Sequence, residues 1–359
     1  MTQWKGNILS AELTGKSHDP EMRAVLTGMP AGIEIDTEAL AAFMARRAPG
    51  KDAWSTPRKE ADAVEFLSGT SAADGALLTT TGSAVELRIR NTNTRSGDYA
   101  EMARMPRPGH ADYAYFAQTG HPIEPGGGAF SGRITALVCA VGYLALSALE
   151  QRGIHVNARM VEVGGVQCDT DVVTSEIADV IAQAKAEGDS VGGKIRVGIE
   201  GVPAGIGGAY FEGLDCSLGS AFFGIPAVKA VEFGAGVGAA RMKGSENNDD
   251  FLVLSDGRIR TKTNNHGGLL GGITSGMPLV ATLTVKPTPS IARAQQSFDL
   301  TTHKAEILEI KGRHDPCIVP RAIPVVEAVA GLVVLDALLA VDEASGKDLS
   351  NHKDSIHKD

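Results

Sequence analysis

The sequence predicts an α+β fold in which sheets cover a layer of helices on both faces. Two long segments, one following Ser131 and one following Pro316, are apolar on nearly every side of the helix that each would form. A helix that is apolar all round must be covered on both sides. Several other segments show strand patterns, so sheets on either side of a helical layer would bury these helices.

The helices can be placed by their caps. Asp36 can accept hydrogen bonds from the first turn of a helix that runs through Arg47. Ser131 can cap the first long apolar helix, which should end near Gly153. A third helix is amphipathic and spans residues 174–186. The second apolar helix follows Pro316.

Strands are expected where β-branched and apolar residues alternate or cluster between turn residues. The chain shows no convincing linker or internal repeat. We therefore expect one domain over residues 1–342, followed by a frayed charged tail over 343–359. The expected strands are Ala84–Arg90, His155–Val163, Lys194–Glu200, Ala230–Phe233 and Val280–Val285.

Composition and charge exclude several classes of function. The 359 residues carry 34 Lys and Arg against 43 Asp and Glu, a net charge of −9, which argues against nucleic-acid and anionic-membrane partners. The apolar stretch from Ala322 to Val341 contains Glu327 and Asp336 and is expected to be a core helix rather than a membrane span. No signal peptide is evident, and the four cysteines stand far apart. We expect a cytoplasmic, reduced protein without disulfides or a bound metal.

The basic residues recur in loops rich in glycine, serine and proline. Arginine among backbone N–H donors is well suited to hold phosphate or carboxylate groups. Any one of these residues could equally be a solvated surface charge, but seven loops of the same composition favour a polyanionic ligand. The residues are Arg46, Arg47, Arg58, Lys59, Arg95, Arg107, Arg133, Lys286 and Arg313.

Three histidines lie in similar loops, each with an acidic neighbour. They are His18 in "GKSHD", His110 in "RPGHADY" and His314 in "GRHDP". This composition is typical of a proton donor beside an anion, although a structural histidine would show it too. "GGGAFSGR" could bind an anion at a helix start or be a plain capped turn. It is not followed by GK[ST], and no GxGxxG follows a strand, so a nucleotide-binding Walker or Rossmann loop is not indicated.

Taken together, these loops resemble those of the chorismate synthase family. The resemblance runs in order along nearly the whole chain. It rests on "GKSHDPEMRAVLTGMPAGIEID", "RRAPGK", "DAVEFLSG", "NTNTRSGDY", "RPGHADY", "GGGAFSGRITA", "GDSVGGKI", "GVPAGIG", "NNHGGLLGGITSGMP", "KPTPS" and "GRHDPCIVPRAIPVVEA".

The resemblance implies a cytoplasmic homotetramer with a β-α-β sandwich fold, in which a helical layer lies between antiparallel sheets. It implies a lyase that removes phosphate from 5-enolpyruvylshikimate 3-phosphate by anti-1,4 elimination to give chorismate, in the shikimate pathway of aromatic amino acid biosynthesis. Reduced FMN is the implied cofactor, although the reaction has no net redox change. Whether the chain reduces its own flavin, an NADP-linked activity, or relies on an external flavin reductase stays open.

The resemblance also implies roles for individual residues. His18 matches a histidine that protonates the leaving phosphate, His110 one that protonates the reduced flavin, and Asp315 an aspartate that helps to relay the substrate proton. Ser17 and Ser131 match serines of the active-site hydrogen-bond network. Arg47, Arg133 and Arg313 match arginines that bind anions. The implied flavin contacts are Ala129, Phe130, Ser131, Ala227, Gly271, Lys286, Pro287, Thr288, Pro289, Ser290 and Arg313.

Six positions depart from the family pattern, among them Phe130, where the family has serine, and Ile134, where it has glutamate. Lys16 stands where the family has glutamate, and Asp19 where it has glycine; the first would lower the pKa of His18 and the second would raise it. Ala48 and Ala53 replace basic residues. Fewer cations suggest an alternative hypothesis, a diverged flavoenzyme with a less anionic substrate, and a non-catalytic flavin-binding relative is a further one. A Ser17–His18–Asp19 hydrolase is disfavoured because adjacent side chains rarely converge into a triad.

Overall fold

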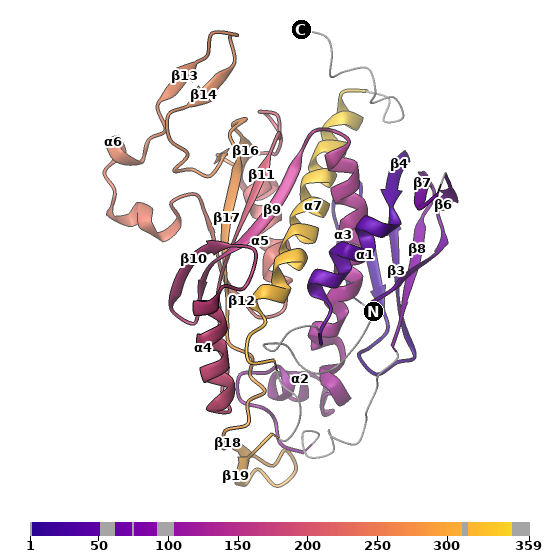
Figure 1. Cartoon of the computed structure of the whole chain (residues 1–359), viewed down its shortest axis with the longest axis vertical. Coiled ribbons are helices and arrows are strands. Elements are labelled where there is room, and N and C mark those ends of the chain that lie inside the picture. Colours follow the sequence, from indigo (N-terminus) through magenta and orange to yellow (C-terminus); the bar gives the residue numbers. More distant parts are fainter. Residues whose placement is uncertain (1, 51–61, 74, 92–103, 311–314, 347–359) are drawn as a thin grey trace.

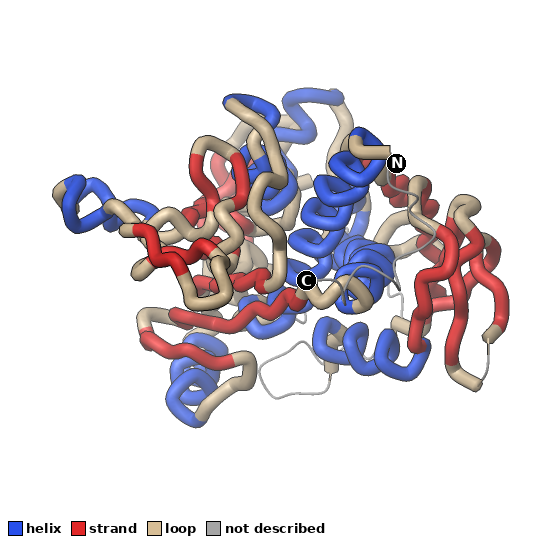
Figure 2. Tube along the Cα trace, turned by 90° about the horizontal axis from the view of Figure 1, so that it is seen from above, coloured by secondary structure: helices blue, strands red, loops and turns tan. Residues whose placement is uncertain are grey.

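Helices form the middle layer of the molecule and sheets lie on either side of it. The computed structural model describes residues 2–50, 62–73, 75–91, 104–310 and 315–346. Figure 1 shows α3 and α7 side by side in the centre, with one sheet to their left and another to their right. The view from above in Figure 2 shows the same three layers. The predicted α+β fold with sheets on both faces of a helical layer is therefore confirmed.

The two central helices pack at very short range. A Cβ atom at Gly142 would lie 2.3 Å from the Cβ of Ala328, and one at Gly331 would lie 2.7 Å from Cδ2 of Leu146. Only glycine allows the backbones to approach so closely. The middle layer consists of α1 (Thr37–Arg47), α3 (Thr135–Glu150) and α7 (Val319–Ala344).

Each main sheet is antiparallel and covers one side of this layer. The first sheet packs on α3 and the second on α7. In the first sheet, Met22, Ala24 and Leu26 of β3 alternate inward and oppose the buried Ile89, Leu87 and Val85 of β8. Its order is β1 (Thr2–Lys5), β2 (Ser10–Thr14), β3 (Glu21–Thr27), β8 (Val85–Arg90) and β5 (Val64–Ser68). The order of the second is β10 (Val166–Thr170), β9 (His155–Val163), β11 (Gly193–Glu200), β17 (Leu279–Val285) and β12 (Val228–Phe233).

Smaller elements surround the sandwich. The helices are α2 (Asp112–Thr119), α4 (Ser175–Ala186), α5 (Leu214–Phe223) and α6 (Gly244–Asn247), with short 3-10 turns η2 (Pro125–Phe130), η3 (Gly132–Ile134), η4 (Tyr210–Glu212) and η5 (Gly236–Arg241). A three-stranded sheet has the order β4 (Ala31–Asp36), β7 (Leu77–Thr81) and β6 (Thr70–Ala72). Three hairpins pair β13 (Phe251–Val253) with β14 (Ile259–Thr261), β15 (Leu269–Leu270) with β16 (Ile273–Thr274), and β18 (Gln295–Phe298) with β19 (Ala305–Leu308).

The predicted helix starts are confirmed. Asp36 accepts hydrogen bonds from the backbone of Glu38 and Ala39 at the start of α1. Thr174 caps α4 through the backbone N–H of Ile177. Ser131 accepts from the N–H of Arg133, but it caps η3 rather than α3 itself, because the chain makes one 3-10 turn first. All five predicted strands are present within two residues of their expected bounds. The predicted tail lies largely in residues 347–359, outside the described chain.

The two longest apolar helices are core helices. The most apolar 18-residue window of α7 is 89% buried and that of the helix over 132–150 is 61% buried, so burial inside the fold accounts for their composition. The acids inside α7 are also satisfied. Asp336 accepts from the backbone N–H groups of Asn7, Ile8 and Leu9, and so fastens the β1–β2 turn to α7.

Replacing Asp336 by alanine should destabilise the protein. Three backbone N–H groups would lose their acceptor in a site where the aspartate is 5% exposed. We expect a loss of about 2 to 4 kcal/mol in the free energy of unfolding, measured by denaturant titration at fixed protein concentration. Glu343→Ala, at an exposed position of the same helix, is the control and should change the midpoint little. Equal midpoints for the two variants would contradict the fastening role of Asp336.

Candidate functional site

The candidate site lies where the N-terminal ends of α3 and α7 meet several loops. These ends point toward the part of the molecule that holds α2 and the β18–β19 hairpin (Figure 1). A glycine-rich loop lies between the two predicted histidines. A Cβ atom at Gly126 would be 2.7 Å from Nε2 of His18, and one at Gly127 would be 3.6 Å from Nε2 of His110. The structure thus brings together two loops that are almost a hundred residues apart in the sequence.

The His18 loop is a tight turn between β2 and β3. The backbone N–H of Asp19 donates to the carbonyl oxygen of Lys16 at 3.2 Å, which closes the turn around Ser17 and His18. Ser17 is buried and His18 is half-buried. Because Gly126 has no side chain and a φ of 74°, its backbone can lie directly against the imidazole. One edge of the ring therefore faces the glycine-rich loop.

His110 is held by a buried ion pair. Asp112 accepts from Nδ1 of His110 at 2.6 Å and from Nε of Arg107 at 2.7 Å. Burial would raise the pKa of Asp112, but hydrogen bonds from Arg107 and His110 outweigh it and hold the pKa well below its ordinary value. The 2.6 Å contact with an ionised Asp112 requires the proton on Nδ1, so Nε2, which lies 3.4 Å from Nη2 of Arg107, is the ring nitrogen that does not contact the carboxylate. Nε2 lies on the side of the ring that faces Gly127.

Two of the predicted anion-binding arginines share one buried carboxylate. Arg47 donates to Oδ2 of Asp62 from Nη2 at 2.6 Å and from Nε at 3.0 Å, and Nη1 of Arg133 donates to Oδ1. Side-chain exposure is 3% for Arg47, 5% for Arg133 and zero for Asp62. Burial would raise the pKa of Asp62, yet the two arginines lower it. The two guanidiniums and one carboxylate leave this cluster with a single positive charge.

Asp315 is joined to the same cluster through a residue that sequence reasoning missed. Nη1 of Arg321, in the first turn of α7, donates to Oδ2 of Asp315 at 2.7 Å, and its Nε donates to the carbonyl oxygen of Arg47 at 2.9 Å. Burial lowers the pKa of Arg321, which Asp315 partly offsets. Arg313, assigned to both substrate and flavin, lies outside the described residues, as do Arg58, Lys59, Arg95 and His314.

Most of the predicted flavin contacts lie near His110. The backbone N–H of Lys286 donates to the carbonyl oxygen of Ala227 at 2.9 Å, and its Nζ donates to that of Gly109. Ser290 accepts from Nη1 of Arg107 at 3.2 Å. Burial and, to a smaller extent, Lys229 lower the pKa of Lys286. The segment Lys286–Ser290 is therefore held against the loop that carries His110.

The remaining predicted contacts divide between two places. Ala129 and Phe130 follow the glycine-rich loop and are exposed, and the Phe130 ring lies 5.8 Å from that of Tyr115. Gly271 is different, because it lies in the β15–β16 turn. Figure 1 draws β16 near the top of the molecule and α2 near the bottom, so one chain does not bring Gly271 together with the other predicted contacts.

The unusual Lys16 is paired across the site. Its Nζ lies 2.7 Å from Oε1 of Glu124, just before the glycine-rich loop, and both side chains are about half exposed. A hydrogen bond to Glu124 and then its charge raise the pKa of Lys16. Among the other departures, Ala48 is buried at the end of α1, and Ala53 lies outside the described residues.

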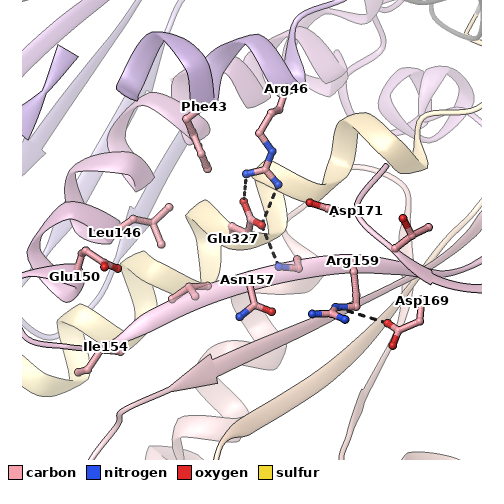
Figure 3. A pocket seen from close by; sticks show the side chains of 13 residues that line it. Phe43, Arg46, Leu146, Glu150, Ile154, Asn157, Arg159, Asp169, Asp171 and Glu327 are labelled. Atoms are coloured by element: carbon pink, nitrogen blue, oxygen red, sulfur yellow. Dashed lines mark hydrogen bonds and ion pairs between the residues drawn. The ribbon is translucent and has the colours of Figure 1, made fainter. Parts of the chain in front are cut away.

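A separate cavity of about 510 Å³ opens beside α1, α3 and β9 (Figure 3). In it, Arg46 donates to both oxygens of Glu327 at 2.7 and 3.0 Å, and Arg159 faces Asp169 at 3.6 Å. Its lining also includes Glu150 and Asp171, so four acids surround two arginines. Such a cavity repels anions. Arg46 is the one predicted anion-binding residue in its lining, and it is paired with Glu327; none of the catalytic or cofactor-binding residues implied by the resemblance lines it.

Comparisons with known proteins give a consistent result. The family model described as chorismate synthase matches residues 9–339. The chorismate synthase of Thermococcus gammatolerans is 43% identical, over 93% of this chain and 97% of that protein, and that of Pyrococcus abyssi is 42% identical with the same coverage. The chorismate synthase of Methanocella arvoryzae is 41% identical, over 93% of this chain and 94% of that protein. A crystal structure of a chorismate synthase matches with a TM-score of 0.70 and 25% identity, over 96% of this chain and 94% of that chain.

The ion pair between Lys16 and Glu124 can be tested by a charge-reversal cycle. Lys16→Glu and Glu124→Lys each place like charges together, so each variant should unfold at a lower temperature than the parent. The doubly reversed protein should recover most of that loss. Because the pair is exposed, this coupling should shrink in high salt. Strictly additive changes in melting temperature at low salt would show that the pair contributes nothing.

Proposed function

The chain belongs to the chorismate synthase family, and on that premise we propose how its candidate site carries out the reaction. The enzyme is a phosphate-eliminating lyase of the shikimate pathway. It converts 5-enolpyruvylshikimate 3-phosphate to chorismate by anti-1,4 elimination of phosphate and a ring proton. The observation that supports this site is the convergence of His18, His110 and the glycine-rich loop at the N-terminal ends of α3 and α7.

His18 donates a proton to the phosphate as it leaves. A protonated imidazole is a suitable acid at neutral pH, and the developing negative charge on the leaving oxygen favours the transfer. The tight turn and the contact with Gly126 limit the movement of the ring. Ser17 and Ser131 supply hydroxyl groups to the surrounding hydrogen-bond network.

Arg47, Arg133 and Arg313 hold the anionic groups of the substrate. The Arg47–Asp62–Arg133 cluster contributes one net positive charge from a nearly dry environment, where an electrostatic interaction is stronger than in water. Because Asp62 already holds the two guanidinium groups in place, few protein dipoles need to reorient when the phosphate leaves.

The residues beside His110 fit a flavin. The hydroxyl oxygen of Thr288 is buried and has no hydrogen-bond partner among the described residues, so a polar group of a bound ligand would satisfy it. Lys286 brings positive charge to this segment, and Arg107, which is paired with Asp112, donates to Ser290 at its other end; both suit the FMN phosphate. The chemistry that reduced FMN supplies when bound is electron density for phosphate departure and a site for the ring proton.

His110 and Asp315 handle protons at the flavin. Asp112 keeps the Nδ1 proton of His110 in place, so Nε2 would be the donor toward a bound flavin when the ring carries a proton on both nitrogens. Asp315, oriented by Arg321, would lie beside a bound flavin and would help to move the ring proton of the substrate. Both assignments follow from the positions that match the family motifs.

The enzyme is proposed to be a cytoplasmic homotetramer. Large apolar side chains are exposed on η4 and on the β13–β14 hairpin, including Tyr210 at 87%, Phe211 at 95% and Phe251 at 72%. Such residues suit an interface between copies. Gly271 would then contribute to the site of a neighbouring copy. The four cysteines are free, which suits a reducing compartment. The reduced cofactor would come either from the chain's own reduction of FMN or from an external flavin reductase.

An anaerobic assay with chemically reduced FMN tests the site. We expect stoichiometric flavin binding, a change in the flavin spectrum on adding 5-enolpyruvylshikimate 3-phosphate, and formation of chorismate. His110→Ala should abolish turnover and leave the circular dichroism unchanged, whereas the exposed control His121→Ala should stay active. Flavin binding without turnover would favour the hypothesis of another, less anionic substrate. Absence of flavin binding would remove the cofactor assignment, and an active His110→Ala enzyme would remove the role of His110.

Gly126→Ala should lower kcat more than the strain of placing alanine at a positive φ would by itself. The new methyl group would lie 2.6 Å from Cδ2 of His18 and would displace the ring. A displacement of about 1 Å can cost roughly 100-fold in rate. Gly120→Ala is the matched control, because Gly120 has the same φ of 74° but open space around it. Similar kcat values for the two variants, measured by chorismate formation, would argue against His18 packing on this glycine during catalysis.

A further inference from the structure

Asn91 occupies the point where the first sheet meets the His18 loop. It follows β8 directly, and Arg90 at the end of β8 is paired with Glu21 at the start of β3. The backbone N–H of Asn91 extends this pairing by donating to the carbonyl oxygen of Pro20 at 2.9 Å. The residue is therefore placed beside the turn by the register of two strands.

The side chain of Asn91 holds both ends of the segment that contains Ser17 and His18. Its Nδ2 donates to the carbonyl oxygen of Asp19 at 2.7 Å and to that of Lys16 at 3.2 Å. Its Oδ1 accepts from Nε of Arg133 at 3.0 Å. The opposite amide orientation would direct oxygen at two carbonyl oxygens and NH₂ at a guanidinium, so the contacts fix the orientation.

The other end of this connection is anchored in the interior. Arg133 is bound to Asp62, which also holds Arg47, and Asp62 is completely buried. A buried network of ion pairs and hydrogen bonds resists movement, because breaking one bond leaves a charge or a polar group without a partner in a low dielectric. The turn that carries His18 is thus attached through one amide to the most buried ionic cluster of the site.

We propose that Asn91 is a positioning residue for His18. It fixes the backbone on both sides of the histidine, so that Nε2 stays aligned with the site, and it couples that alignment to Arg133. Asn91 itself has no contact with the reacting groups in this proposal. The inference rests on the proposed function only for the catalytic consequence; the attachment of the turn follows from the hydrogen bonds alone.

Asn91→Asp separates the two halves of the attachment. The carboxylate keeps the shape and the acceptor for Arg133 but places an oxygen against the carbonyl oxygens of Lys16 and Asp19. With reduced FMN present, kcat for chorismate formation should fall roughly 10- to 100-fold. KM should rise as well, because the added carboxylate lies against Arg133 and offsets the single positive charge of the Arg47–Asp62–Arg133 cluster.

A second measurement does not depend on turnover. Diethyl pyrocarbonate modifies accessible imidazoles, and the extent at His18 can be followed by mass spectrometry of its peptide. The half-buried His18 should be labelled several-fold faster in Asn91→Asp than in the parent at the same pH, because the turn is released. Labelling of the exposed His121 serves as the internal reference in each sample.

A matched control changes an amide of the same kind elsewhere. Asn264 donates from Nδ2 to the carbonyl oxygen of Pro278 at 2.9 Å and accepts from the N–H of Gly268 at 2.8 Å. Asn264→Asp should therefore disturb a different loop and leave His18 labelling at the parental rate. Asn91→Ser, which removes both donors without adding charge, is the second test variant and should act in the same direction as Asn91→Asp.

The outcomes separate this inference from the proposed function. Parental labelling of His18 in both Asn91 variants would overturn the inference. Faster labelling with unchanged kcat would show that the alignment of His18 does not matter, and would overturn the positioning role. Faster labelling together with a fully active His18→Ala enzyme would instead remove the catalytic role of His18, while the attachment by Asn91 would stand.

Discussion

The contact between α3 and α7 is the constraint on which the rest of the fold depends. Gly142 and Ala328 let the backbones of the two helices approach closely, so the helices form one continuous apolar layer. This helical layer has two broad apolar faces, and a sheet packed on each face removes both of them from water. The same contact sets the N-terminal ends of the two helices side by side. That end is where the loops with His18, His110 and Asp315 can meet.

The sequence predicted the elements whose signals are local. α1, α4, β8 and four of the five strands of the second sheet (β9, β11, β12 and β17, but not β10) are bounded by caps and turn residues that lie within a few positions of them. The strands β2 and β3 were not predicted, because their alternation is short and becomes decisive only when β8 lies opposite. The β13–β14 and β18–β19 hairpins were missed for the same reason. Pairing between distant segments supplies information that neither segment carries alone.

For the site, motifs located the loops but not the contacts between them. His18, His110 and Lys286–Ser290 were predicted from glycine-rich surroundings and family resemblance. The structure places the two histidines against one glycine-rich loop and holds Lys286–Ser290 against the loop that carries His110. Asp62, Asn91 and Arg321 were missed as participants. Asp62 follows Arg47 by 15 residues and precedes Arg133 by 71, so no spacing rule connects the three. Counting basic residues also overstated the positive charge, because Arg46, Arg107 and the Asp62 cluster are already neutralised in part by buried acids.

The pairing of charges also reduces the expected electrostatic effect of Lys16, one of the two unusual residues in the His18 loop. An isolated ammonium at Lys16 would oppose a positive charge on His18, but the carboxylate of Glu124 lies 2.7 Å from it, so the field of one largely cancels that of the other at longer range. Half exposure to water weakens what is left. Asp19 contributes its backbone carbonyl to Asn91 as well as a side chain. The departure at position 16 therefore adds an attachment of the turn to Glu124, whereas the attachment at position 19 uses a backbone carbonyl that a glycine would also offer. His18, the proposed acid, is retained.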